Sequence, residues 1–586
     1  ETLAKQADMS WIRDLCPDPE TNSNSPNRTS REVRSGHYVK VKPTPLPSPK
    51  LVIFSPVMVE ELGLSVETCS SQDFLRFFSG DIDAVSGFDS WATPYALAIM
   101  GNPHYNNCPF KNGNGYGDGR AISIGEVIAP NGKRWEMQLK GGGQTPFCRG
   151  ADGRAVLRSS VREFLASEAM HHLGVSTTRA LSLIVSQKEK SKRPWYSGRN
   201  SNVDPESDPR LSQAPPELRQ MLVAMLKQQT GEPDVMIEES CAITCRVAPS
   251  FTRIGHFDLF ARRASKPGAT QEQRQQHEMM VKHGFDREYP DVLPDAPLPE
   301  RALAVFKEAI SRIGNMVAGW LRVGFCQGNF NCDNCLIAGR TMDYGPFGFI
   351  DMYRASFAKW TGSGDHFAFM NQPQAAIANL GTLATSLAPL LDDAGKKSLE
   401  SLARSMDAEI EDIVNNMWCS KLGFKQSSKK AIAVFVELEE LMGACEVDYT
   451  ILFRQLGHLP KTFGAGFEQA DASSLLRCIQ SAFYKEQPQH FESWSKWIKK
   501  WLTLLVEEGA LDGAGDQMMA TNPKYILREN LLVSAYEAAK SGDYALVHDL
   551  YQLIRNPYAE QPEMESRYYL RAPSEALTKS GTAVMT

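Results

Sequence analysis

The chain has 586 residues, of which 42% are hydrophobic and 23% are charged, and its formal net charge is −6 at pH 7. The composition is ordinary for a globular protein, and the length allows several domains because one core stops growing at about 250–300 residues. The negative charge argues against general nucleic-acid binding. No apolar run reaches the roughly 18 residues that predict a membrane-spanning helix, and twelve cysteines in so long a chain do not indicate a disulfide framework.

The first part of the chain alternates between strand and helix patterns. Residues 1–50 are polar and proline-rich, which predicts an extended arm. Residues 51–64 predict a strand followed by a short helix, and a further helix is expected at 95–100. Two alternating segments around Asn131–Gly132 predict a β-hairpin, and residues 155–173 carry apolar side chains at helical spacing.

The pattern then changes from mixed to helical. Residues 178–187 and 235–249 predict two more strands, and the polar stretch 187–218 between them is interpreted as a surface insertion. Residues 301–323 predict a long helix. Beyond residue 374 the pattern is almost entirely helical, so the whole chain predicts an α+β fold.

The stretch 325–352 carries two acidic points ten residues apart. Asp333 is followed by Asn334, and Asp343 opens the run DYGPFGFID. A short apolar segment broken by Gly339 lies between them and predicts a hairpin that holds two carboxylates and an amide close together. Such oxygen ligands suit Mg²⁺ shared with substrate phosphates, and protein kinases build the same part. The alternative is that these are ordinary polar turn residues.

The residues upstream follow the order of a kinase-like nucleotide site. Gly117 and Gly119 allow backbone amides to approach phosphate, and Arg120 adds charge. Lys140, at the end of a strand, is expected to hold phosphates, and Glu163, one helix later, is expected to pair with it. Each residue has a simpler alternative. The glycines could serve an ordinary turn, Lys140 could be a solvated lysine at the end of a strand, and Glu163 could be a surface glutamate. The joint order favours the site.

Two arginines, Arg246 and Arg253, flank a proline-containing turn. They are expected to grip a terminal phosphate, because guanidinium groups bind phosphate oxygens in pairs. Structural ion pairs are the alternative for both. His256, in the same segment, is interpreted as a packed or capping histidine.

A zinc site is an alternative to the magnesium site, because four cysteines occur in CxxxC and CxxC pairs: Cys241, Cys245, Cys332 and Cys335. The second pair flanks Asp333 and Asn334, so zinc and magnesium would compete for one loop. Neither pair has the neighbouring glycines or histidines that are usual in a zinc ribbon or finger. The magnesium interpretation is therefore favoured.

Together these motifs resemble the selenoprotein O family, protein-kinase-like enzymes that transfer AMP from ATP to protein hydroxyl groups. The resemblance runs through WEMQLKGGGQTPFCRGADGRAVLRSSVREFLASEAMHHLGVSTTRAL, RVAPSFTRIGHFDLFA, NCDN and DYGPFGF. It extends to NQP, NPKYILREN and SGD, and so covers nearly the whole chain.

The resemblance implies a two-lobed, protein-kinase-like fold. Its parts would be an N-terminal arm (1–85), a first lobe with the surface insertion (86–245), a second lobe with the catalytic loops (246–445) and a helical C-terminal extension (446–586). ATP would bind in an orientation inverted relative to ordinary kinases. The α-phosphate would then be attacked, and pyrophosphate would leave.

Residue roles are carried over by motif. The resemblance implies that Asp333 is the base for the acceptor hydroxyl, and that Asn334 and Asp343 hold Mg²⁺, with Mn²⁺ as an alternative. Lys140 would contact phosphate and Glu163 would pair with it. The remaining nucleotide-binding residues would be Gly117, Gly119, Arg120, Arg246 and Arg253.

The resemblance also implies partners and a location. Partners would be proteins that offer Ser, Thr or Tyr hydroxyls, with no nucleic acid and no transmembrane segment. A mitochondrion is the implied compartment and a plastid the alternative. A leader is expected to have been removed, because the chain starts at Glu1 without a methionine.

Three departures from the family pattern bear on activity. Gln327–Gly328 stands where His-Gly is usual, and residues 101–116 replace a glycine- and aromatic-rich run. The family cysteines after DYGPFGF and near the C-terminus are missing, so redox control through a disulfide is not expected. The alternative to an active enzyme is an inactive kinase-like subunit of a larger organellar assembly.

Overall fold

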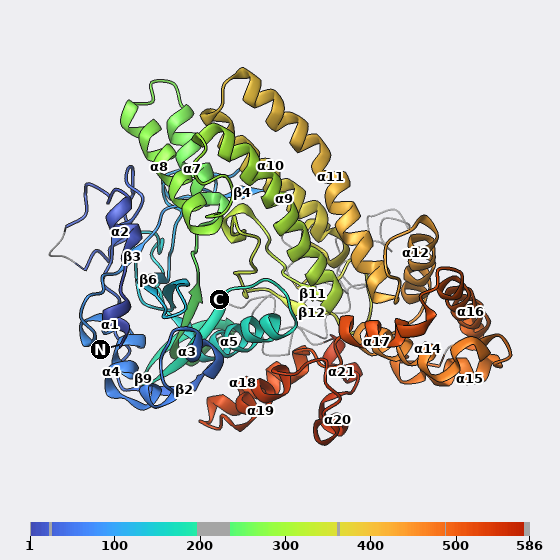
Figure 1. Ribbon diagram of the computed structural model, residues 1–586. Helices are drawn as coiled ribbons and strands as arrows, with labels where there is room; N and C mark the ends of the chain where they lie inside the picture. The colour runs from blue at the N-terminus through green and yellow to red at the C-terminus, as the bar shows by residue number, and fades with distance from the viewer. Residues whose placement is uncertain (1, 23–25, 196–234, 360–363, 487, 579–586) are drawn as a thin grey trace, which may run out of the picture.

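A computed structural model describes residues 2–22, 26–195, 235–359, 364–486 and 488–578. An antiparallel sheet lies in the first part of the chain and helices dominate after residue 254, which confirms the predicted α+β class (Figure 1). No helix in the described ranges has both the length and the apolar character needed to cross a bilayer.

The main sheet has eight strands, and seven of them form one continuous ladder. In spatial order these are β1 (Val39–Lys40), β3 (Trp91–Ala92), β6 (Ala121–Ile128), β7 (Arg134–Lys140), β10 (Val235–Ala248), β9 (Arg179–Trp195) and β2 (Pro49–Phe54). The eighth strand, β8 (Ala155–Val156), pairs with β10. The N-terminal part of the chain therefore supplies both edges of the sheet.

Side-chain alternation along β7 and β10 separates the two faces of the sheet. Met137, Leu139 and Cys245 pack in one core with helices α3 (Pro56–Glu61) and α4 (Gln72–Phe78). Successive side chains of a strand point to opposite faces, so Lys140 faces the other way. Helix α5 (Leu157–His172) covers β9 and β10 on that second face (Figure 1).

The predicted hairpin and the helix after it are both present. β6 and β7 are joined through Gly132, whose φ of 79° suits the tight turn that Asn-Gly favours. α5 ends just before Gly174, which has a φ of 72° and so provides the left-handed residue that often ends a helix.

The predicted helix at 95–100 is wrong. Its backbone N–H groups bond outside the segment, since Ala96 donates to the carbonyl of Gly255 at 2.8 Å. Within it, β4 (Ala98–Ile99) pairs with β5 (Asn102–Pro103). Distant backbone partners therefore replace the helical hydrogen bonds.

The first residues of the predicted surface insertion at 187–218 form a strand. β9 continues through residues 187–195 and pairs with β10 as far as Val235. A polar sequence forms a strand here because the neighbouring strand supplies its backbone hydrogen bonds. Residues 196–218 lie outside the described ranges.

The middle of the chain forms five larger helices around the main core: α7 (Ile254–Ser265), α8 (Gln271–Glu288), α9 (Leu298–Val323), α10 (Gln372–Leu387) and α11 (Asp393–Lys421). The long helix predicted at 301–323 is α9, which starts one turn earlier. It ends at Gly324, where φ is 77°.

Smaller helices follow and build a second core: α12 (Lys429–Ala444), α13 (Tyr449–Leu456), α14 (His458–Phe463), α15 (Ala472–Arg477), α16 (Phe491–Glu507) and α17 (Leu511–Thr521). The next two, α18 (Glu529–Lys540) and α19 (Ala545–Ile554), return to pack against α5 (Figure 1). Short helices occur near both ends: α1 (Thr2–Gln6), α2 (Ser10–Asp14), α20 (Pro562–Tyr568) and α21 (Ser574–Thr578).

The acidic stretch 325–352 is a paired loop and not the predicted strand hairpin. Its ends pair as β11 (Phe325–Cys326) and β12 (Gly348–Phe349). The apolar segment in the middle forms only isolated bridges: Cys335 pairs with Thr341 around Gly339, and Leu336 pairs with Arg253. It does not become a strand because its backbone bonds to the start of α7, where the N–H of Ile254 donates to the carbonyl of Cys335 at 2.9 Å.

Candidate active site

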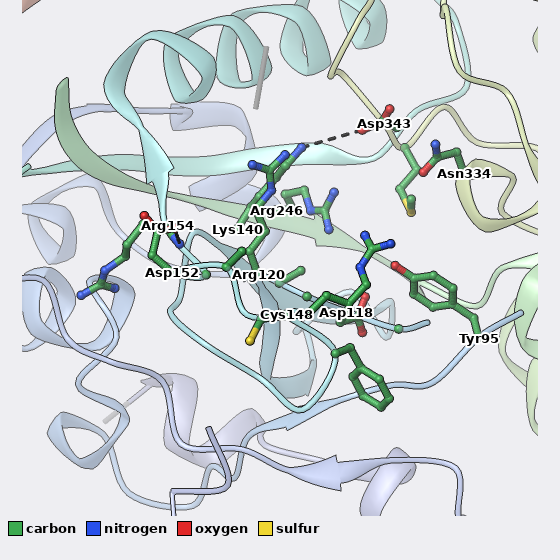
Figure 2. A pocket seen from close by; sticks show the side chains of 18 of the residues that line it. Tyr95, Asp118, Arg120, Lys140, Cys148, Asp152, Arg154, Arg246, Asn334 and Asp343 are labelled. Carbon is green, nitrogen blue, oxygen red and sulfur yellow. Dashed lines mark hydrogen bonds and ion pairs between the residues drawn. The ribbon is translucent and has the colours of Figure 1, made fainter. Parts of the chain in front are cut away.

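A cavity of about 510 Å³ lies where the sheet meets the acidic loop (Figure 2). Most of the predicted site residues line it: Gly117, Gly119, Arg120, Lys140, Arg246, Arg253, Asn334 and Asp343. The fold therefore gathers segments that are more than 200 residues apart in the sequence. Glu163 and Asp333 lie behind this lining, in contact with residues that form it.

Lys140 and Glu163 form the ion pair that the sequence predicts. Lys140 ends β7 on the face that α5 covers, and its Nζ lies 2.7 Å from Oε2 of Glu163. The same Nζ is 3.8 Å from Oδ1 of Asp343, the dashed contact in Figure 2. Burial lowers the pKa of Lys140, and the two carboxylates oppose that effect. The lysine thus joins the sheet, α5 and the acidic loop.

Arg246 continues this network on the neighbouring strand. Its Nη1 lies 3.5 Å from the second carboxylate oxygen of Glu163, and its Nη2 donates to the side-chain carbonyl of Gln138. Arg246 and Gln138 are directly opposite in the β7–β10 ladder, which explains their contact. Arg246 therefore makes an ion-pair contact within the protein and also lines the cavity.

Arg253 is held from two sides. Its Nη2 lies 2.7 Å from Oδ1 of Asp118, and its Nη1 donates to the backbone carbonyl of Asp333 at 3.0 Å. The guanidinium carbon also lies 4.3 Å from the centre of the Tyr95 ring. Arg253 thus ties the glycine-rich turn, residues 117–119, to the loop that carries Asp333.

Asp118 is a central residue that the sequence analysis missed. Its Oδ2 accepts hydrogen bonds from the backbone N–H and the hydroxyl of Thr93, at 3.0 and 2.7 Å. That hydroxyl lies 2.8 Å from Nε2 of His256, whose Nδ1 accepts the backbone N–H of Arg253. His256 is therefore the capping histidine that the sequence predicts, and burial holds its pKa well below the usual value. The only sequence signal for Asp118 is its place between two glycines.

Gly117 and Gly119 are needed for close packing of the turn. A Cβ atom on Gly117 would lie 2.4 Å from Cγ of Phe147 and 2.6 Å from the carbonyl oxygen of Thr93. A Cβ on Gly119 would lie 3.0 Å from the carbonyl oxygen of Phe147. The turn therefore lies directly on the loop between β7 and β8, which contains Phe147, and both segments line the cavity.

Asp333 has the environment of a proton acceptor. Burial raises the pKa of its carboxyl group to about 6, although Arg253 opposes the shift. No described residue forms a hydrogen bond with its buried Oδ1. An unpaired carboxylate oxygen with a pKa near neutrality is suited to accept a proton.

Asn334 and Asp343 supply oxygen atoms from the same cavity wall. Asn334 donates its amide N–H to the carbonyl of Asn329 at 2.9 Å, which leaves its amide oxygen available as a ligand. One carboxylate and one amide oxygen fit Mg²⁺, which usually takes few protein ligands and completes its shell with water and phosphate. Within the described ranges no three His, Cys, Asp or Glu side chains cluster as a metal site.

The cysteine pairs lie apart from each other, which corrects the zinc alternative. Cys241 and Cys245 are buried in the core between the sheet, α3 and α4. Cys332 and Cys335 are buried in the main core with α5 and α9. Each pair therefore packs as small apolar side chains.

Gln327, the departure from the usual His-Gly, supports the acidic loop. Its backbone N–H donates to the side-chain oxygen of Gln372 at 3.0 Å, and its own side-chain oxygen accepts the N–H of Asn329 at 2.8 Å. Asn329 in turn holds Asn334. The glutamine is therefore part of the support for the proposed metal ligand.

The cavity carries an excess of positive charge. Seven cationic side chains line it, against three acidic ones: Arg120, Lys140, Arg149, Arg154, Arg193, Arg246 and Arg253 against Asp118, Asp152 and Asp343. Arg193 pairs with Asp152 and Arg154 with Glu189, each at 2.8 Å. Neither Arg120 nor Arg149 has an ion-pair partner among the described residues. A polyanionic ligand would neutralise this excess.

Besides Asp118, four of these charged residues are not predicted from the sequence: Arg149, Asp152, Arg154 and Arg193. Three lie in the loop between β7 and β8, in the run CRGADGR, and one lies on the extension of β9. The density of charge in that run was an available signal. Sequence patterns do not reveal the contribution of β9, because its polar outer part is typical of a surface insertion.

Comparison with known proteins gives one consistent result. A family model described as protein adenylyltransferase SelO matches residues 24–201 and 222–555. The chain is 35% identical to a protein nucleotidyltransferase YdiU of Xanthomonas campestris, covering 97% of this chain and 96% of that protein. It is 33% identical to the Rhodopirellula baltica protein of the same name and 34% identical to that of Aromatoleum aromaticum, each over 99% of this chain and 98% of the relative.

Proposed function

This chain belongs to the SelO family of protein adenylyltransferases, and from that premise we propose that its cavity transfers AMP from ATP to Ser, Thr or Tyr hydroxyls of other proteins. The observation that carries the proposal is the distribution of charge: two arginines that have no ion-pair partner among the described residues line the same space as Lys140, which pairs with Glu163, and the two oxygen ligands. A triphosphate and a divalent cation match that distribution.

The proposed architecture is a two-lobed, protein-kinase-like fold. Three features support it: an antiparallel sheet, a helix whose Glu163 pairs with Lys140 of the sheet, and acidic loops that follow in the helical part. Protein kinases arrange a lysine–glutamate pair and two acidic loops in the same order.

The phosphates are proposed to lie among the cations beneath the glycine-rich turn. In the described part of the chain Arg120 and Arg149 form no ion pair, and Lys140 lines the same space. An inverted nucleotide would place its β- and γ-phosphates with Arg246 and Arg253, and its α-phosphate towards the acidic loop. This arrangement would expose the α-phosphorus to an incoming hydroxyl group.

The proposed reaction forms one P–O bond and breaks another. The acceptor oxygen attacks the α-phosphorus while its proton passes to the carboxylate of Asp333. The bond between the α-phosphorus and the bridging oxygen breaks, and pyrophosphate leaves. Arg246 and Arg253 would hold the leaving group in line, and such positioning supplies most of the rate in this class of reaction.

Asn334 and Asp343 are the residues that would hold Mg²⁺, with Mn²⁺ as the alternative. A bound divalent cation neutralises phosphate charge. Asp343 also contacts Lys140 at 3.8 Å, so one carboxylate is shared between the metal site and the phosphate-binding lysine.

Product analysis tests the proposal. The protein is incubated with ATP and MgCl₂, using its own chain and a lysate as acceptors, and the released phosphates are separated. Pyrophosphate should appear in step with acceptor modification. Release of ADP would mean phosphoryl transfer and would overturn the inverted orientation. If ATP neither reacts nor raises the melting temperature, the alternative of an inactive subunit is favoured.

A further inference from the structure

Arg162 is a fully buried cation next to Glu163 on α5. Its Nη1 donates to Oε1 of Glu529, the first residue of α18, at 2.7 Å. Its Nη2 donates to the carbonyl of Phe347 at 3.0 Å, and the guanidinium carbon lies 4.4 Å from the centre of that ring. One side chain therefore joins α5, the loop that follows Asp343, and the C-terminal helix pair.

The residue before Glu529 makes a second link to the same loop. Arg528 bonds to the carboxylate of Asp351, just beyond β12. It also bonds to both carboxylate oxygens of Asp448, at 2.7 and 3.0 Å. Two consecutive residues of the C-terminal region thus make both links: Arg528 binds the acidic loop, and Glu529 binds α5.

The second helix of the pair also reaches α5. The hydroxyl of Tyr551 on α19 donates to Oγ of Ser55 at 3.2 Å, and Ser55 donates to Glu168 of α5 at 2.6 Å. The ring of Tyr551 lies 5.8 Å from that of Phe164, centre to centre. Figure 1 shows α18 and α19 lying along α5. The contact therefore extends along the helix.

Geometry links this contact to the nucleotide site. Arg162 and Glu163 are consecutive helical residues, so a shift of the backbone that moves one side chain moves the other. Glu163 points to Lys140 while Arg162 points to Glu529 and Phe347. Loss of the Glu529 carboxylate would leave the buried guanidinium of Arg162 without its acidic partner, and a protein avoids such a buried charge by rearrangement.

We infer that Arg162 and Glu529 are positioning residues through which the C-terminal helix pair holds α5 in the orientation that pairs Glu163 with Lys140. The inference rests on the proposed function, because it assigns a support to that same site. The C-terminal region is then required for turnover although none of its described residues lines the cavity.

The test uses the full chain with Glu529→Gln, which keeps the side-chain shape and removes the charge. We expect kcat for nucleotide transfer to fall on the order of 10- to 100-fold, the usual effect of a small misplacement. Glu537→Gln is the matched control, because Glu537 lies on the exposed side of α18, with 48% of its side chain exposed. It should keep wild-type activity.

A double-mutant cycle separates positioning from general stability. In a Glu163→Gln background the same Glu529→Gln change should cost less than about 2-fold in kcat, because the pair it supports is already lost. An equal loss in both backgrounds would overturn the inference. Glu529→Asp, which keeps the charge but shortens the reach, provides a second variant if the first does not fold, and it should also lower kcat.

The outcomes also distinguish this inference from the proposed function. If the wild-type protein transfers no nucleotide, the proposed function is overturned. If the wild type transfers nucleotide and both Glu529 variants match it, only the positioning role is overturned.

Discussion

Lys140 and Glu163 form an ion pair across the sheet and α5, with Nζ and Oε2 2.7 Å apart and both side chains largely buried. Arg246 approaches the other oxygen of the glutamate at 3.5 Å. One carboxylate therefore orients two cations of the cavity. That arrangement holds both side chains in place before a nucleotide arrives, which lowers the entropic cost of binding.

Replacing Lys140 with alanine should weaken ATP binding. Loss of a charge-assisted contact to phosphate costs about 1.5–3 kcal/mol, or roughly 10- to 100-fold in Kd. Isothermal titration calorimetry with ATP and MgCl₂ measures the change. Lys133→Ala is the control, because Lys133 lies on the exposed hairpin with 59% of its side chain exposed. Unchanged affinity in Lys140→Ala would remove the lysine from the phosphate site.

Asp333 and Asp343 should give different defects. Asp343→Ala should abolish Mg²⁺-dependent nucleotide binding, because the residue is proposed as a direct metal ligand. Asp333→Ala should keep ATP binding and slow transfer by roughly 10²–10⁴-fold, the usual size of a general-base contribution. Calorimetry and single-turnover transfer measure the two effects. Equal binding loss in both variants would argue against separate roles.

Asp118→Asn should destabilise the protein and weaken nucleotide binding. Arg253 would lose its buried acid, and breaking a buried pair costs about 3–5 kcal/mol. Urea-induced unfolding and ATP affinity measure the two consequences. Asp83→Asn is the control, since its pair with Lys42 is exposed and should contribute less than about 1 kcal/mol. A variant as stable as the wild type would show that Arg253 does not depend on Asp118.

Glu136→Gln should show a pH-dependent stability difference from the wild type. Burial and the neighbouring Glu126 raise the pKa of Glu136 from 4.5 to about 7. Its Oε2 accepts the backbone N–H of Phe251, which lies between Arg246 and Arg253 in the sequence. The folded state therefore binds a proton more tightly than the unfolded state. The stabilisation by that proton is complete below pH 4.5 and is lost as the pH rises to about 7.

The glutamine cannot ionise, so its stability relative to the wild type should increase by about 3 kcal/mol between pH 4.5 and 7 and stay constant above. Thermal unfolding across that pH range measures the difference. Glu400→Gln, at an exposed helical position, should show no such trend. A difference independent of pH would contradict the raised pKa.

Local patterns predicted much of the fold. Asn131–Gly132 and the apolar spacing of residues 155–173 were sufficient for the hairpin and for α5, because turn chemistry and helical periodicity are local properties. The segment at 95–100 was predicted wrongly because its hydrogen bonds go to Gly255 and Tyr116, far away in sequence. Strand pairing similarly decided the outer half of β9.

The candidate site divides in the same way. Lys140 and Glu163 can be predicted because the order of strand, helix and acidic loops in the sequence matches that of a kinase-like nucleotide site. Asp118 and Arg162 were missed because their partners lie 135 and 367 residues away. The mitochondrial or plastid location, the removed leader and membership of an organellar assembly stay predictions, because no contact in the described residues bears on them.

The most direct test of nucleotidyl transfer follows the label from ATP. Two samples of the protein with MgCl₂ and acceptor proteins receive ATP labelled either at the α-phosphate or at the γ-phosphate, with Asp333→Ala as the matched control. The α-label should appear on protein in the wild type, far less in the variant, and the γ-label in neither. Transfer of the γ-label, or of no label by a wild-type protein that binds ATP, would contradict the assignment of this cavity as an adenylyltransferase site.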